Sequence, residues 1–188
     1  MQPNPQVAII MVLVSLLTTS CASPIQTSTP IPTTVLTNTP HIVLGELIKA
    51  EKGGFAYKPI LGYKVRDSSD FAMMSNDKEK VIINLVSTPS KDNKITNIMD
   101  LALVSFGLTQ INESEKYNLN GVDGIKVEVK TDAFFEGATG EVIILIPDEN
   151  RYFTAIAIAG DSGMGWNPAG KKLFDDVLNN LVFFEPPK

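Results

Sequence analysis

The chain has 188 residues, with 16 basic and 21 acidic side chains and a formal net charge of −5 at pH 7. This acidic balance argues against nucleic acid as a partner and against electrostatic attraction to anionic lipid. His41 is the single histidine and Cys21 the single cysteine, which removes most transition-metal sites and any disulfide within the chain. We therefore expect no metal site and no cofactor.

The first predicted element is a bacterial lipoprotein signal peptide, residues 1–20. Its uncharged run from Val7 to Leu17 has 11 residues, whereas a membrane-spanning helix needs ~20. The small residues Thr18, Thr19 and Ser20 precede Cys21 and let an extended chain enter a peptidase site. We predict that Cys21 carries a lipid and holds the protein at the extracytoplasmic face of the cell membrane.

Two details of this segment depart from the usual lipoprotein pattern. Residues 1–6 contain no Lys or Arg, and Thr18 stands where such signals usually have Leu. The alternative is an ordinary secretory signal cut nearby, which leaves Cys21 as an odd, exposed thiol in an exported protein. Attachment of a lipid accounts for that thiol more economically.

Residues 21–40 are predicted to be the lipidated cysteine followed by a tether. From Ala22 to Pro40 there are six Thr, two Ser and four Pro among 19 residues, and no charge. A segment of this composition cannot bury a core and favours a solvated, partly polyproline-like chain. Residues 41–188 are long enough for one hydrophobic core and are predicted to form a single domain.

The first half of this domain is predicted to hold short strands and one helix. Glycines and prolines delimit strands at 55–57, 63–65, 71–74 and 81–86. A helical pattern follows over 94–106 and ends at Gly107, a plausible cap. Its apolar face is expected to consist of Ile98, Leu101, Ala102 and Ser105.

The second half is predicted to be two hairpins and a final helix. Asn120-Gly121 is a hairpin signal between strands at 116–119 and 125–129. The apolar run 142–146 predicts a central strand, which returns through a turn at 147–150 into a strand at 151–159. Asn167 and Pro168 predict the start of an amphipathic helix. The fold class expected is α+β, a mostly antiparallel sheet flanked by helices.

Four segments carry a resemblance to a known family, and together they span about residues 53–186. They read GGFAYKPILGYKV, NLNGVDGIKVEV, EVIILIPDENRYFTAIAIA and LFDDVLNNLVFFEP. They resemble PsbP-like bacterial lipoproteins of the Mog/PsbP-like group. The resemblance implies an α-β-α sandwich and a function that is mostly binding or accessory and rarely catalytic.

Three short motifs are considered as catalytic, phosphate-binding or calcium sites, and none is predicted to be one. Gly160 to Gly163 copies the GDSG of trypsin-like proteases, but Ser162 lacks a histidine base near it in the sequence. The segment 165–172 nearly matches a phosphate-binding loop, but Lys172 replaces the final Ser or Thr. Asp67, Asp70 and Asp77 match no calcium-loop spacing and are interpreted as solvated loop carboxylates.

The candidate partner-binding residues are aromatic and sulfur-containing side chains in two loops. Phe134 and Phe135 lie among acidic and small residues between two strands, where exposed aromatics often mark a partner surface. Adjacent residues of an extended chain point to opposite sides, so at most one ring is expected to reach the core. Met164 and Trp166 are the candidates in the second loop, and Trp166 is expected to pack against the last helix.

These observations predict a membrane-anchored lipoprotein that acts as a non-catalytic binding or accessory module of the cell envelope. Its expected partners are the membrane, through the lipid on Cys21, and an unknown envelope protein. Two alternatives stay open. A small-ligand receptor for a transporter needs a pocket of ~300 Å³ or more. A hydrolase with an unrecognised acidic site needs convergent carboxylates or a shifted pKa.

Overall fold

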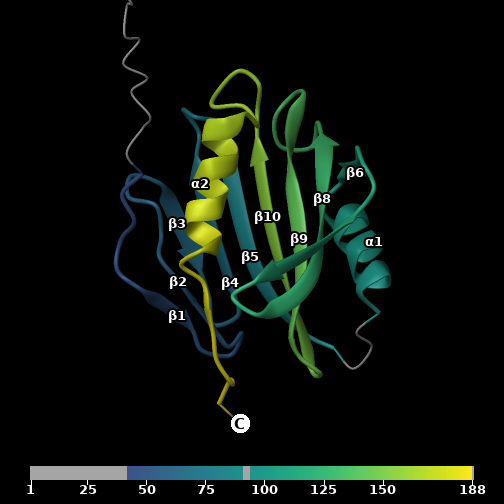
Figure 1. The fold of residues 1–188 in the computed structure, drawn as a ribbon. Helices are drawn as coiled ribbons and strands as arrows, with labels where there is room; N and C mark the ends of the chain where they lie inside the picture. The colour runs from purple at the N-terminus through teal and green to yellow at the C-terminus, as the bar shows by residue number, and fades with distance from the viewer. Residues whose placement is uncertain (1–41, 91–93, 188) are drawn as a thin grey trace, which may run out of the picture. The chain divides into compact units, whose positions relative to one another are not determined.

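The computed structural model describes residues 42–90 and 94–187, which belong to one compact unit. The predicted signal peptide, Cys21, the tether and His41 lie outside these residues. The described residues contain eleven strands and two helices (Figure 1). In chain order they are β1 (Ile48–Ala50), β2 (Phe55–Tyr57), β3 (Lys64–Asp67), β4 (Phe71–Asn76), β5 (Val81–Pro89), α1 (Ile95–Ser105), β6 (Thr109–Gln110), β7 (Glu115–Leu119), β8 (Val122–Thr131), β9 (Ala138–Asp148), β10 (Arg151–Ala159), α2 (Pro168–Leu178) and β11 (Val182–Phe183).

Eight of the strands form one large antiparallel sheet in the order β3-β4-β5-β10-β9-β8-β6, and β7 pairs with the other end of β8. The predicted hairpin joins β7 to β8, with Asn120 and Gly121 both at positive φ, as a two-residue hairpin turn requires. The predicted central position of the run 142–146 is confirmed. Residues 142–145 are buried, and β9 lies between β8 and β10.

One face of the large sheet is covered by α2 together with a small antiparallel sheet, β1-β2-β11. We call this the α2 face. Phe153 of β10 packs edge-on against Phe55 of β2 and Phe183 of β11, with ring centroids 5.0 Å apart in both pairs. These rings join the small sheet to the large one. Alanines 155, 157 and 159 of β10 belong to the same core, and their small side chains leave room for the helix.

The helix α2 begins as the sequence predicts. The side-chain oxygen of Asn167 accepts hydrogen bonds from the backbone N–H groups of Ala169, at 2.8 Å, and Gly170, at 3.2 Å. Pro168 occupies the first helical position, where its missing N–H costs nothing. The predicted apolar face is confirmed, because its residues are buried: Leu173, Phe174, Val177, Leu178 and, just beyond the helix, Leu181.

The opposite face of the large sheet, the α1 face, carries a second core around α1, formed with residues of β8, β9 and β10. The predicted apolar face of this helix is partly wrong. Ile98 and Ala102 are buried, but Leu101 and Ser105 are exposed, and Met99 and Leu103 are buried instead. Residues 98–104 are apolar except for Asp100, so two different stripes fit the helical period, and tertiary packing selects one of them.

The predicted α-β-α sandwich is wrong. The part of the chain that the structure describes has a β-rich fold, with 46% of its residues in strands and 15% in helices, and its strands form two sheets. The layer over the α2 face is part helix and part sheet, and on the α1 face residues of β4 and β5 such as Met73 and Ile82 stay half-buried. The strands β1, β6 and β11 have only two or three residues, too few to show a period in the sequence. None of the helices in the described ranges is long and apolar enough to span a membrane.

Candidate functional site

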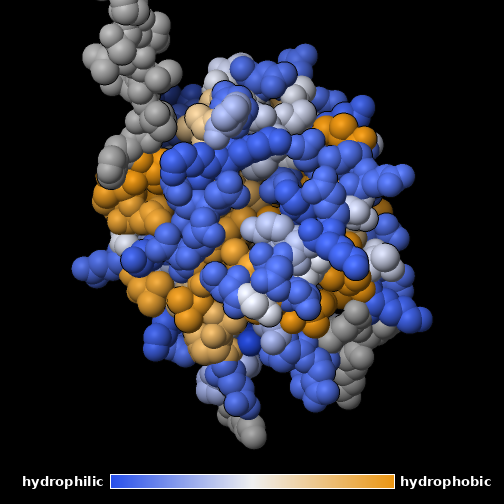
Figure 2. Space-filling view, viewed as in Figure 1, coloured by the Kyte–Doolittle hydropathy of each residue, from blue (hydrophilic) through white to orange (hydrophobic). Residues whose placement is uncertain are grey.

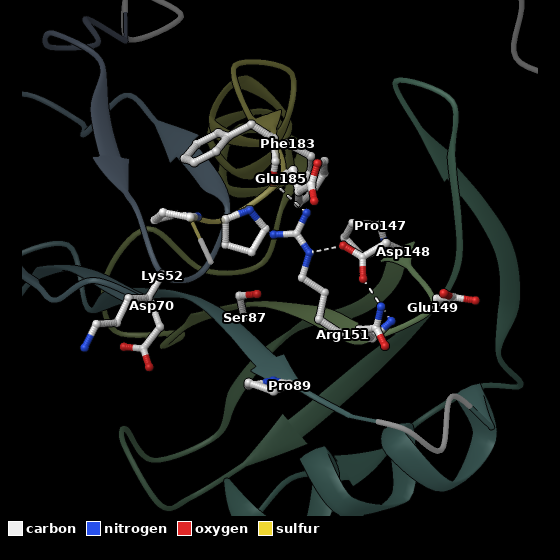
Figure 3. Close-up of a pocket in the computed structure, with 14 residues that line it drawn as sticks. Lys52, Asp70, Ser87, Pro89, Pro147, Asp148, Glu149, Arg151, Phe183 and Glu185 are labelled. Carbon is white, nitrogen blue, oxygen red and sulfur yellow. Dashed lines mark hydrogen bonds and ion pairs between the residues drawn. The ribbon is translucent and has the colours of Figure 1, made fainter.

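A cleft of about 860 Å³ opens at the end of the large sheet where β9 turns into β10 (Figure 3). Its walls come from this turn, from the end of β5, from Lys52 and Asp70 in two loops, and from residues 183–187. Backbone hydrogen bonds join these segments, including Ser87 N–H to the Asp70 carbonyl at 3.0 Å and Ser90 N–H to the Asn150 carbonyl at 2.8 Å. Much of the lining is apolar, with four prolines and two aromatic rings: Pro89, Pro147, Pro186, Pro187, Phe183 and Phe184.

Arg151 stands at the centre of the cleft and is buried (Figure 3). Its Nε donates to the carboxylate of Asp148 across the turn. Its Nη1 donates to the Gly53 carbonyl at 2.5 Å, and its Nη2 donates to the Phe184 carbonyl at 2.8 Å. A guanidinium presents a rigid, planar set of donors, so this one side chain fixes three segments that are far apart in the sequence.

Gly54 makes this arrangement possible. Its φ is +62°, and a Cβ at this position would lie 1.9 Å from Nη1 of Arg151 and 2.5 Å from the Phe184 carbonyl oxygen. The N–H of Phe184 in turn donates to the Gly54 carbonyl at 2.9 Å. The wall formed by residues 183–187 is therefore held to the cleft by backbone and guanidinium contacts together.

The charges around the cleft favour an apolar occupant without a negative charge. Four acidic and two basic residues line it: Asp70, Asp148, Glu149, Glu185, Lys52 and Arg151. Since Arg151 is paired with Asp148, its positive charge is already neutralised. The described residues contain no group of three or more His, Cys, Asp or Glu side chains placed to hold a metal ion.

A second, smaller cleft of about 130 Å³ lies on the α2 face between α2 and strands β8 and β9, and charged residues line it. Lys126 Nζ lies 3.6 Å from a Glu141 oxygen and 3.7 Å from a Glu115 oxygen. Lys171 of α2 pairs with Glu128 of β8. Burial raises the pKa of Glu141 against the opposing effect of Lys126, and burial also raises the pKa of Asp175.

This charged cleft has the convergent carboxylates that an acid–base site needs, but not the space. Pockets for small ligands usually measure 300 Å³ or more. Its lysines already pair with three of its carboxylates. Two of these pairs join neighbouring strands of the sheet, and the pair between Lys171 and Glu128 joins α2 to the sheet.

The structure separates the four predicted partner-binding residues. Phe134 is 37% exposed, whereas Phe135 is half-buried against the α1-face core and under the ammonium group of Lys80, 5.6 Å from the ring centroid. Only one of the two rings reaches the core, as predicted, although residues 132–135 form a bend and not the extended chain assumed in that prediction. Met164 and Trp166 pack instead against the α2-face core, on the other side of the sheet. Trp166 lies 6.0 Å from the Phe174 ring of α2, as expected.

None of these four residues lines the cleft around Arg151. Phe134 and Phe135 precede β9, whereas Asp148 ends it, and the eleven residues of β9 span ~36 Å. The protein therefore has two separate candidate contact regions at opposite ends of the large sheet. The cleft is one of them, and the loop with exposed Phe134 is the other.

The motifs that were set aside have structural roles in the described part of the chain. The N–H of Met164 donates to the Glu79 carbonyl at 2.7 Å, which ties the loop of exposed Ser162 to the turn between β4 and β5. The segment 165–172 is the capped start of α2. Asp67, Asp70 and Asp77 each bond a different partner: Tyr57, Ser68 and Lys64, respectively.

Sequence reasoning missed Arg151 and residues 183–187 as parts of a site. The sequence predicts Arg151 only as the start of a strand, although an arginine that begins a mostly apolar run, directly after an acidic turn, is a signal of a special role. Phe183 and Phe184 enter the sequence analysis only as part of the family resemblance. Nothing in the sequence pairs them with a residue 33 positions away.

No protein-family model and no curated protein matches this chain. Among solved structures, the chain is similar to a crystal structure of a protein from Bacteroides thetaiotaomicron VPI-5482, with a TM-score of 0.52 and 11% sequence identity. The match covers 76% of this chain and 50% of the other, so the chain corresponds to about half of that protein. At this level of identity the likeness concerns the fold alone, and the chain shares its architecture with part of a larger bacterial protein.

Proposed function

We propose that this protein is a lipoprotein, anchored through Cys21 at the extracytoplasmic face of the cell membrane, that acts as a non-catalytic binding or accessory module of the cell envelope. The short apolar run and the small residues before Cys21 support the anchor. The resemblance to PsbP-like lipoproteins, a group that acts mostly by binding, supports the same class of function and is itself part of the proposal.

The observation that carries the binding role is the cleft around Arg151. Its volume of about 860 Å³ lies within the range of ligand sites. Prolines and aromatic rings have little side-chain freedom to lose when a partner binds, and the buried guanidinium holds the walls in place. Four acidic and two basic residues line the cleft, so the occupant that fits it is an apolar segment of an envelope protein that carries a positive charge.

The anchor is tested by the substitution Cys21→Ser. Wild-type protein expressed in a bacterial host should incorporate a radiolabelled fatty acid and sediment with membranes. The Cys21→Ser variant should lose the label and remain in the membrane fraction only as uncleaved precursor. A soluble wild-type protein whose mature N-terminus is not Cys21 would refute the anchor.

The binding role is tested by reversing charge at the rim of the cleft. Wild-type protein is cross-linked in intact envelopes and the attached protein is identified. The variant Glu185→Lys should lose this cross-link, because a positive charge at the rim repels a cationic segment. Glu113→Lys is the matched control, because it changes charge equally at an exposed residue outside the cleft. Equal cross-linking by both variants would exclude the cleft as the contact.

A second candidate function, a small-ligand receptor for a transporter, is favoured by the same volume. Native mass spectrometry of protein released gently from membranes separates the two proposals. A receptor retains a small molecule of defined mass, and Glu185→Lys alters its occupancy. An accessory module is recovered free of small molecules, and its mass shift appears only after cross-linking.

A further inference from the structure

The first described residues form a two-stranded ribbon with aliphatic side chains on both sides. The N–H of Leu61 donates to the Val43 carbonyl at 3.0 Å, and the N–H of Gly45 donates to the Pro59 carbonyl at 2.7 Å. Leu44 and Ile60 lie opposite each other as an antiparallel bridge. These two residues face inward and pack in the α2-face core.

The outer side of the ribbon is aliphatic as well. Val43 is 52% exposed and Leu61 is 59% exposed, and the hydrogen bond between them places them side by side. Leu61 lies over Gly45, with its Cδ2 atom 3.2 Å from the position that a Cβ of Gly45 would take. Leu47, 46% exposed, follows in the same segment. We call Val43, Leu47, Pro59 and Leu61 the aliphatic ribbon. Hydrophobic residues gather on this side of the molecule, at the left of Figure 2.

The charge of the chain is distributed unevenly around this ribbon. Residues 42–66 contain five basic and two acidic residues, a net charge of +3, whereas residues 67–188 contain 11 basic and 19 acidic residues, a net charge of −8. Lys64 pairs with Asp77 of the neighbouring turn, which leaves an excess of two positive charges. The segment 42–66, which exposes these aliphatic side chains, is therefore net positive although the domain as a whole is acidic.

We propose that the aliphatic ribbon is a membrane-contact surface that docks on a bilayer containing anionic lipid. Val43 lies 22 residues after Cys21, so the proposed lipid, on which this inference rests, would keep the ribbon within reach of the bilayer at all times. Exposed aliphatic side chains beside a basic residue such as Lys58, which directly precedes Pro59, suit the interface between headgroups and acyl chains. Protein contacts instead concentrate their binding energy in Trp, Tyr and Arg, and Leu and Val are under-represented there.

The test places a fluorescent reporter on the ribbon. In the mature lipidated protein Cys21 carries the lipid, so Leu61→Cys adds a single free thiol for the environment-sensitive dye NBD. The matched control is Val104→Cys on the outer side of α1, which is also an exposed aliphatic position (80%). In protein-free vesicles of phosphatidylcholine and phosphatidylglycerol, emission from position 61 should shift to the blue. The shift should shrink in phosphatidylcholine alone or at high salt, and position 104 should show none.

The outcomes separate this inference from the proposed anchor. Flotation with the vesicles together with a shift confined to position 61 supports both. Flotation with no shift, or with equal shifts at positions 61 and 104, overturns the membrane-contact surface and leaves the anchor intact. If the wild-type protein does not float, the anchor is wrong. The soluble chain carrying Cys21→Ser and labelled at position 61 is then mixed with the same vesicles, and a missing shift overturns the surface as well.

Discussion

The two faces of the large sheet share the same strands but are covered in different ways. Each face has one helix of 11 residues. On the α2 face the helix has a side-chain cap and a continuous apolar stripe, and a small sheet fills the remaining area. On the α1 face the side chain of the N-cap residue, Lys94, makes no capping hydrogen bond to the helix. The outer side of this helix exposes Leu101 and Val104.

This difference shows where the stability of the domain is concentrated. The α2-face core includes the rings of Phe55, Phe153 and Phe174, all fully buried, whereas the α1-face core contains smaller aliphatic residues and half-buried rings. Because the free energy gained on burial grows with the apolar area removed from water, the α2 face should contribute more to folding. The α1 face is the less stable part and the one that can change with less effect on the rest.

The largest expected effect comes from removing one phenylalanine ring on each face, from within α2 and from the C-cap of α1. Phe174→Ala removes a fully buried ring from α2 and should lower the free energy of unfolding by about 3–5 kcal/mol. Phe106→Ala, at the half-buried end of α1, should cost roughly 1–2 kcal/mol, because less apolar area is lost. Urea unfolding followed by circular dichroism measures both. Equal losses would show that the two faces are equally stabilising.

The sequence predicted the α2 face better than the α1 face, and the reason is physical. In α2, charged residues such as Lys171 and Asp176 alternate with the apolar stripe, so only one face can be buried. The apolar stretch of α1 offers two stripes, and only packing against β8 and β9 decides between them. The overall class was predicted wrongly because pairings of two or three residues, such as β2 with β11, join segments more than 120 positions apart.

The two candidate contact regions also differ in how well the sequence predicts them. The exposure of Phe134 agrees with its place in a short segment of acidic and small residues, which a sequence displays. The cleft depends on Arg151 reaching the backbone of Gly53, 98 residues earlier, and of Phe184, 33 residues later. Contacts of this range are set by the topology of the two sheets, so no local pattern could have predicted them.

An intermediate effect is expected at the cap that distinguishes the two helices. Asn167→Ala removes the acceptor of two backbone N–H groups at the start of α2 and should cost about 1 kcal/mol. Asn179→Ala, an exposed asparagine at the other end of the helix, is the matched control and should change stability little. Thermal unfolding of both variants gives the comparison. A loss at Asn179 as large as the loss at Asn167 would show that the cap does not account for the difference between the helices.

The smallest expected effect lies in the charged cleft between α2 and strands β8 and β9, where charged side chains take the place of the apolar core. Glu141 lies opposite Ala157 and is largely buried there, and burial raises the pKa of its carboxyl group above its usual value of 4.5, despite the nearby Lys126. A carboxyl group whose pKa is higher in the folded state favours folding only when it is protonated. This stabilising contribution is present at low pH and is lost as the pH rises through the raised pKa.

Glu141→Gln should therefore raise the melting temperature modestly at pH 7, and the gain over wild type should shrink as the pH falls toward 4, where the wild-type carboxyl group becomes protonated. Glu115→Gln is the control, because Glu115 also faces Lys126 but is largely exposed. Glu115→Gln should change the melting temperature little, and the change should not shrink as the pH falls toward 4. If Glu141→Gln is instead destabilising at pH 7, the attraction between Lys126 and Glu141 outweighs the cost of burial. The charged cleft would then stabilise the α2 face as its apolar core does.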